Sequence, residues 1–145
     1  MDFKLHQLSA SNLSSLFNAA YIDAEATDKD DCPFCVLTGE ITQIVGAVEE
    51  LNILRFAHQV HAPKDLKEED LKKLINAFNE QLPLIKAYIR KNNDGDLLLA
   101  FEYDHVVLKH DTISAKTLVQ LSRMFESGIE SSYAIYNQLF AAQAQ

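Results

Sequence analysis

The sequence predicts an α+β domain in which helices pack against a five-stranded antiparallel sheet, in the order α-β-β-β-α-β-β-α. Two β-rich blocks have internal connections too short for crossover helices, which favours antiparallel pairing. Amphipathic segments with apolar residues at helical spacing precede, separate and follow these blocks. A length of 145 residues fits one domain over residues 1–145. A domain of this size buries roughly 70% of its unfolded surface, so a hydrophobic core is expected.

Composition excludes several classes of function. The chain has 13 Lys and Arg against 21 Asp and Glu, a net charge of −8, which disfavours binding to nucleic acids or anionic membranes. It has no apolar run near the ~20 residues that span a bilayer, and Met1–Ser15 has no secretory pattern. Two cysteines make no disulfide framework. We therefore expect a cytoplasmic protein with no nucleic-acid or membrane partner.

The first expected element is an amphipathic helix over Ser9–Ala20, with Ser9 or Ser11 as its N-cap. Its apolar face follows i, i+3, i+4 and i+7 spacing and consists of Leu13, Leu16, Phe17 and Ala20. The acidic stretch Glu25–Asp31 has the composition of a turn. The chain then changes from helical to strand-like patterning.

Three strands are expected next, over Cys32–Leu37, Ile41–Val48 and Leu51–His61. They are rich in β-branched and apolar residues, and Thr38–Glu40 and Glu49–Glu50 are plausible turns between them. The short connections predict a meander.

A second helix follows Pro63, and Asp65 with Glu68 has the spacing of a capping box. Its apolar stripe consists of Leu71, Leu74, Ile75, Phe78 and Leu82. Pro83 is expected to close the helix.

The last elements are a hairpin and a long helix. Ile85–Arg90 alternates apolar and polar residues, Asn92–Asp96 favours a hairpin turn, and Leu97–Tyr103 forms the returning strand. A helix is expected over Ile113–Phe140, with Thr112 or Ser114 as N-cap. Its predicted buried stripe consists of Leu118, Leu121, Phe125, Ile129, Tyr133, Tyr136 and Phe140.

Cys32-Pro33-Phe34-Cys35 has the spacing of a dithiol redox pair. Redox motifs work where a helix N-terminus or nearby cations lower the pKa of the first thiol. Here strand-like residues follow the motif, and the acids Asp28, Asp30 and Asp31 precede it and would raise that pKa. Buried strand cysteines are the favoured interpretation, and a thiol-dependent protein using Cys32 and Cys35 is an alternative.

His58 and His61 could complete a Cys₂His₂ zinc site with these thiols. The predicted meander places the two pairs at opposite ends of the sheet, which disfavours zinc. Asp94-Gly95-Asp96 lies between two strands, which favours a hairpin tip over a calcium site. The sequence therefore assigns no catalytic, cofactor-binding or metal-binding residue, and His6, His105 and His110 have no recognisable nucleophile partner.

One part of the sequence resembles a known family. NNDGDLLLAFEY, residues 92–103, follows EEDLKKLINAFNEQLPLIKAYI and precedes the long helix. This arrangement resembles the YbjN family, bacterial proteins described as sensory transduction regulators, whose fold is similar to that of class I type III secretion chaperones. The resemblance extends over roughly residues 9–140 and depends on element order and hydrophobic pattern.

The resemblance implies binding, not catalysis. Family members are small, acidic and cytoplasmic, and are expected to be homodimers without active-site residues. We therefore expect a non-enzymatic, YbjN-type interaction module that binds another protein and modulates its stability, stress response or signalling. A dedicated secretion chaperone for one client protein is the alternative. The predicted protein-binding residues, on an exposed sheet face, are Ile53, Arg55, Tyr88 and Arg90.

Overall fold

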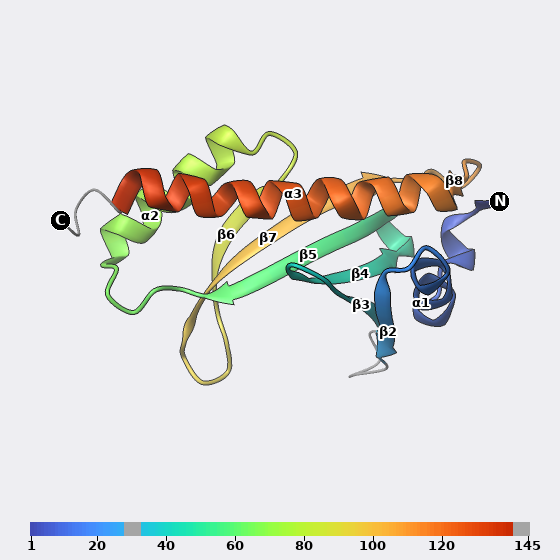
Figure 1. The fold of residues 1–145 in the computed structure, drawn as a ribbon, viewed down its shortest axis with the longest axis horizontal. Helices are drawn as coiled ribbons and strands as arrows, with labels where there is room; N and C mark the ends of the chain where they lie inside the picture. The colour runs from blue at the N-terminus through green and yellow to red at the C-terminus, as the bar shows by residue number, and fades with distance from the viewer. Residues whose placement is uncertain (28–32, 141–145) are drawn as a thin grey trace. The chain divides into compact units, whose positions relative to one another are not determined.

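A computed structural model describes residues 1–27 and 33–140 (Figure 1). Within these ranges the helices are α1 (Ala10–Ala19), α2 (Glu68–Gln81) and α3 (Ala115–Phe140). The main sheet has the order β2-β3-β4-β5-β7-β6. Its strands are Asp23–Thr27 (β2), Phe34–Thr38 (β3), Thr42–Val48 (β4), Ile53–His61 (β5), Lys86–Lys91 (β6) and Leu97–Val106 (β7). A separate pair joins β1 (Asp2–Phe3) to β8 (Ile113–Ser114).

The α+β class is confirmed, but the number of strands was underestimated. The main sheet has six strands, not five, because Asp23–Thr27 pairs antiparallel with β3. The acidic stretch from Glu25 was expected to be a turn. Its start is strand because Ala24 and Ala26 alternate with the acids, and the rest, with Cys32, lies outside the described residues.

The chain divides into two compact units, which are described separately. The first unit contains Met1–His58 and Tyr103–Glu126, and the second contains Gln59–Glu102 and the chain from Ser127 onward.

In the first unit, α1 begins where Ser9 caps it, because the Ser9 hydroxyl accepts a hydrogen bond from Asn12 N at 3.2 Å. Figure 1 shows α1 beside the start of the sheet, where it contacts β2 and β3. The fully buried core of this unit includes Leu13, Phe17, Cys35, Val45, Leu54, Phe56, Leu118 and Phe125. The rings of Phe56 and Phe125, 6.3 Å apart, join β5 to the first half of α3. Ser114, one of the two predicted caps, accepts from Thr117 N at 3.0 Å.

In the second unit, α2 begins at Glu68 with Lys67 as its N-cap, so the predicted cap at Asp65 was wrong. Asp65 lies inside a turn closed by Leu66 N–H bonding Pro63 O at 3.2 Å, which places it too early to cap the helix. The predicted apolar stripe packs inward, and Phe78 contacts Phe101 of β7 at 5.2 Å between ring centroids.

The second unit also contains the predicted hairpin. Gly95 has φ +82°, and Asn92 Oδ1 accepts hydrogen bonds from Asp94 N and Asp96 N at 3.0 and 2.9 Å.

The predicted buried stripe of α3 is confirmed only as far as Ile129. Tyr133 is 51% exposed, whereas Ser132 and Ile135 are buried. After Ile129 the buried positions of the helix follow every third residue, which leaves Tyr133 outside the buried stripe.

Each edge strand of the main sheet is bonded by an asparagine side chain of the helix that precedes that strand in the sequence. Asn18 of α1 donates to Ala24 O at 3.0 Å and accepts from Ala24 N at 3.0 Å. Asn79 of α2 bonds Ala87 O and N in the same way, at 3.0 and 2.8 Å. These backbone groups point away from the neighbouring strand, so the two amides occupy positions where another strand could pair.

Candidate functional site

The first unit has one sheet face that α1 and α3 do not cover. Side chains alternate between faces along a strand, and the face with Cys35, Val45 and Phe56 packs against these helices. We call the opposite face the open sheet face. It consists of Glu25, Thr27, Phe34, Val36, Ile44, Gly46, Val48, Ile53, Arg55, Ala57, Asp104 and Val106.

The open sheet face is unusually apolar. An antiparallel sheet with one uncovered face normally alternates apolar residues inward with polar residues outward. Here Val36, Ile44 and Ala57 form one cross-strand row of half-buried apolar residues. Val106, at the far end of β7, is 61% exposed. Such a surface is typical of a protein contact.

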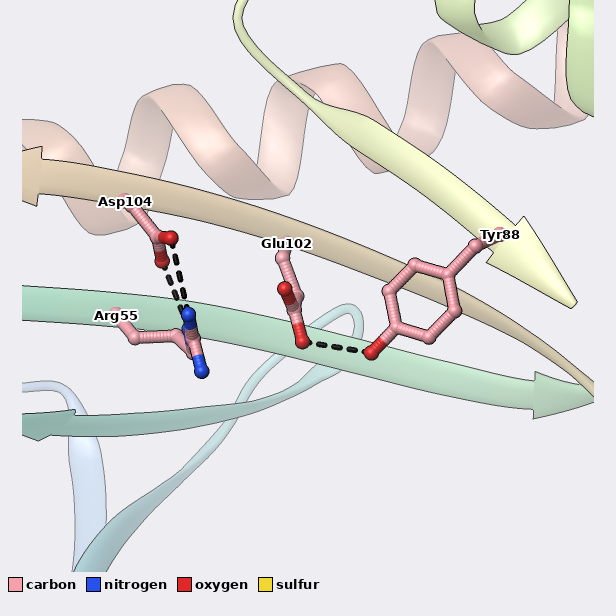
Figure 2. Close-up of polar contacts among 4 residues, drawn as sticks. All are labelled: Arg55, Tyr88, Glu102 and Asp104. Atoms are coloured by element: carbon pink, nitrogen blue, oxygen red, sulfur yellow. Dashed lines mark hydrogen bonds and ion pairs between the residues drawn. The ribbon is translucent and has the colours of Figure 1, made fainter. Parts of the chain in front are cut away.

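One ion pair lies within this face. The guanidinium of Arg55 forms a two-pronged contact with the carboxylate of Asp104, Nε–Oδ1 at 2.8 Å and Nη2–Oδ2 at 3.1 Å (Figure 2). The side chains are 36% and 37% exposed. The pair fixes both side chains, and the charges of Arg55 and Asp104 cancel each other.

The second unit has its own polar contact on β6 and β7. Tyr88 donates its hydroxyl hydrogen to Glu102 Oε1 at 2.6 Å, as Figure 2 shows. Tyr88 is half-buried, and its neighbour Arg90 is exposed, directly opposite Leu98 of β7. Lys86 lies over the Tyr88 ring with its Nζ 5.7 Å from the centroid. Tyr88 is therefore held in place by charged neighbours.

The four predicted contact residues have different environments. Arg55 and Tyr88 are partly exposed and paired, and Arg90 is exposed, but Ile53 is only 8% exposed and offers little contact area. Their role in protein binding stays a prediction.

Sequence reasoning missed both acidic partners on β7. Glu102 and Asp104 alternate with Phe101 and Tyr103, which is the pattern of a strand with one polar face. That signal could have extended the predicted strand beyond Tyr103. What could not be read from the sequence is that Asp104 lies beside Arg55, because the two residues are 49 positions apart.

Cys35 is fully buried on the helix-covered face of β3. Burial raises the pKa of its thiol from 9.0 to about 11, opposed by a backbone hydrogen bond that involves Glu25. A thiol that stays protonated at neutral pH is a poor nucleophile and a poor metal ligand. Cys35 therefore fits a packing role, and Cys32 lies outside the described residues.

His58, which was considered as a zinc ligand and disfavoured, also has a structural partner. His58 is buried, and its Nδ1 lies 2.8 Å from Thr42 O on the neighbouring strand. Cys35 is level with Val45 and Phe56, and Phe56 is two residues before His58, so the expectation that Cys35 and this histidine lie at opposite ends of the sheet was wrong. The intervening strand β4 separates the two positions. Within residues 1–27 and 33–140, no three His, Cys, Asp or Glu side chains cluster as a metal site.

No helix in the described part of the chain is long and apolar enough to cross a membrane.

Comparison with known proteins identifies the family of this chain. A search of curated proteins found no significant match. Among solved structures, the chain is similar to E. coli YbjN, described as "a putative transcription regulator", with TM-score 0.66 and 12% identity over 92% of this chain and 90% of that one. The family model for YbjN, "Putative bacterial sensory transduction regulator", matches residues 9–141. The chain therefore belongs to the YbjN family.

Proposed function

We propose that this protein is a non-enzymatic, cytoplasmic interaction module of the YbjN type, one domain over residues 1–145. It acts as a homodimer that binds another protein and modulates its stability, stress response or signalling. The observation that carries the proposal is the apolar open sheet face of the first unit. Regulators act by contacting other macromolecules, and this face has the composition of a contact surface.

A sheet face fits this role better than the sheet edges. Adding a partner strand to an edge requires free backbone N–H and C=O groups. The outward-pointing groups of Ala24 and Ala87 are already bonded to Asn18 and Asn79. A strand that adds to either edge would have to displace the asparagine amide at that edge, whereas the face can be covered without breaking a hydrogen bond.

Electrostatics support a second copy of the chain as one occupant of this face. The chain carries a net charge of −8, so two copies repel each other over most approaches. On the open sheet face the charges of Arg55 and Asp104 cancel, and Glu25 lies beside Val36 only at the rim. A two-fold symmetric contact requires a self-complementary patch, and a largely apolar face whose central charges cancel meets that requirement.

The dimer is tested by placing a charge on the face. Light scattering coupled to size exclusion should give twice the 16.3 kDa chain mass for the unmodified protein. Val106→Lys and Val36→Lys should each give the monomer mass, because each substitution would bury unpaired ammonium groups in the contact. Leu108→Lys is the matched control, since Leu108 is also an exposed apolar residue, at 55%, but lies beyond the end of β7.

Three outcomes would count against the proposal. A monomeric unmodified protein at tens of micromolar would remove the homodimer. A dimer that survives both lysine substitutions, with circular dichroism unchanged, would place self-association on another surface. Loss of the dimer in Leu108→Lys alone would do the same.

A further inference from the structure

A pocket of about 290 Å³ in the first unit lies on the helix-covered side of the sheet, away from the open sheet face. It is bounded by the start of β2, the end of β3, the start of β4 and one turn of α3. Its lining includes the charged or polar residues Asp23, Gln43, Arg123 and Glu126 and the apolar residues Leu37 and Ile41. The volume is at the small end of ligand sites, which suits a molecule of amino-acid size and not a nucleotide.

Gln43 provides the first indication of a ligand. It is only 4% exposed, and its Nε2 donates to the backbone oxygen of Ser122 at 2.9 Å. Its carbonyl oxygen Oε1 is buried and accepts no hydrogen bond from any described residue. Nearly all buried polar atoms in proteins have a partner, so this acceptor calls for an N–H or O–H donor.

Charged side chains at the pocket provide the second indication. Arg123 and Glu126 are one turn apart on α3, and Asp23 lines the same pocket at the start of β2. None of the three forms an ion pair with another residue in the described part of the chain. The site thus presents one cation and two carboxylates that are not neutralised by each other.

The backbone turn beside the pocket accommodates one of these carboxylates. A methyl group added at Gly39 would lie 3.0 Å from Glu126 Oε2, closer than an ordinary contact. The missing side chain at Gly39 therefore lets the Glu126 carboxylate lie against the turn. Below the charges, Leu37 and Ile41 are 2% and 7% exposed and form an apolar floor.

We propose that this pocket binds an aliphatic α-amino acid in its zwitterionic form. The ammonium group donates to Gln43 Oε1 and to the Glu126 and Asp23 carboxylates, which together fit a cationic donor. The carboxylate of the ligand pairs with the Arg123 guanidinium. The aliphatic side chain lies against Leu37 and Ile41. A ligand with only one of its two charges would leave part of this set unpaired.

The test is a titration of the full-length protein followed by two-dimensional ¹⁵N NMR and calorimetry. The probes are L-leucine, L-isoleucine and L-valine, with 3-methylbutylamine and 4-methylpentanoate as analogues of leucine that lack its carboxylate or its amine. We expect saturable binding of at least one amino acid, with shifts at Gln43 and around Arg123. Each single-charge analogue should bind at least tenfold more weakly than leucine if leucine is the ligand.

Variants assign the two charges separately. Arg123→Gln should weaken amino-acid binding at least tenfold and leave the amine analogue unaffected, whereas Glu126→Gln should weaken both. Lys116→Gln is the matched control, because Lys116 is another exposed cation on α3 outside this pocket. Gln43→Leu should abolish binding, and a thermal melt will confirm that this buried substitution still folds.

Three results would overturn the proposal. One is the absence of saturable binding by all three amino acids at millimolar concentration, which would leave a bound water as the partner of Gln43. Another is equal affinity for leucine and its amine analogue, which would indicate a simple cation site. The third is binding that Arg123→Gln and Glu126→Gln do not change.

Discussion

Arg55 on β5 and Asp104 on β7 form a two-pronged ion pair in the middle of an otherwise apolar sheet face. Both side chains are a little over one-third exposed, and pairs of this kind contribute about 0–1 kcal/mol when water surrounds them. The contribution of such an ion pair to stability rises when a binding partner excludes the water around it. The pair therefore reports on whether the face is covered in solution.

The first prediction uses this property. A double-mutant cycle of Arg55→Gln and Asp104→Asn should give a coupling energy of no more than about 1 kcal/mol in the Val106→Lys background, measured by urea unfolding. In the unmodified protein the coupling should be larger and less sensitive to salt, because the second copy in the proposed dimer would desolvate the pair. Equal coupling in both backgrounds would contradict a covered face.

The second prediction concerns Asn79, which bonds both backbone groups of Ala87. Asn79→Ala should lower the free energy of unfolding by about 1–3 kcal/mol, because two hydrogen bonds to an edge strand are lost. Asn76→Ala, at an exposed position of the same helix, is the control and should cost little. Urea denaturation measures both, and equal losses would show that the Ala87 contacts do not stabilise the fold.

The third prediction follows from the buried thiol of Cys35. In a Cys32→Ser variant, iodoacetamide at pH 8 should label Cys35 slowly in the folded protein and rapidly in urea, as measured by mass spectrometry.

The raised pKa of the Cys35 thiol also makes the stability of the protein depend on pH. Below pH 9 the thiol is protonated in both states, but between 9.0 and about 11 the unfolded chain ionises first, so stability falls. A Cys35→Ala variant should lose this part of the alkaline slope.

The fourth prediction separates the two candidate caps of α1. Ser9→Ala should destabilise the protein by about 1 kcal/mol, because the Asn12 N–H loses its side-chain acceptor. Ser11→Ala, an exposed position inside the helix, should be neutral or slightly stabilising. Thermal or urea melts compare the two, and the reverse ranking would contradict the cap assignment.

The fifth prediction concerns the close approach of Gly128 on α3 to Ile85 in the second unit. Gly→Ala inside a helix normally stabilises by up to about 1 kcal/mol. Here the added methyl group would overlap Ile85 Cδ1, so Gly128→Ala should destabilise instead. Ile85→Val removes that carbon, and in its background Gly128→Ala should cost less. Additive effects in the double variant would show that the contact does not limit this position.

Local signals in the sequence were sufficient for much of the fold. The Ser9 cap, the meander strands and the Asn92–Asp96 turn depend on residues within a few positions of each other, and the structure confirms them. The prediction failed where a stronger nonlocal interaction decided the outcome. Asp23–Thr27 is acidic yet forms a strand, because β3 supplies hydrogen bonds and Asn18 holds its outer edge.

The sequence by itself determined the class of the domain, its acidic charge and its resemblance to the YbjN family, because these depend on composition and on periodicity along the chain. Only the tertiary structure decided which surfaces these residues form. It placed Asp104 beside Arg55 across 49 positions, and it brought Gln43, Arg123 and Glu126 to one pocket. Strand order and helix packing set such contacts, and neither is encoded in any local stretch of sequence.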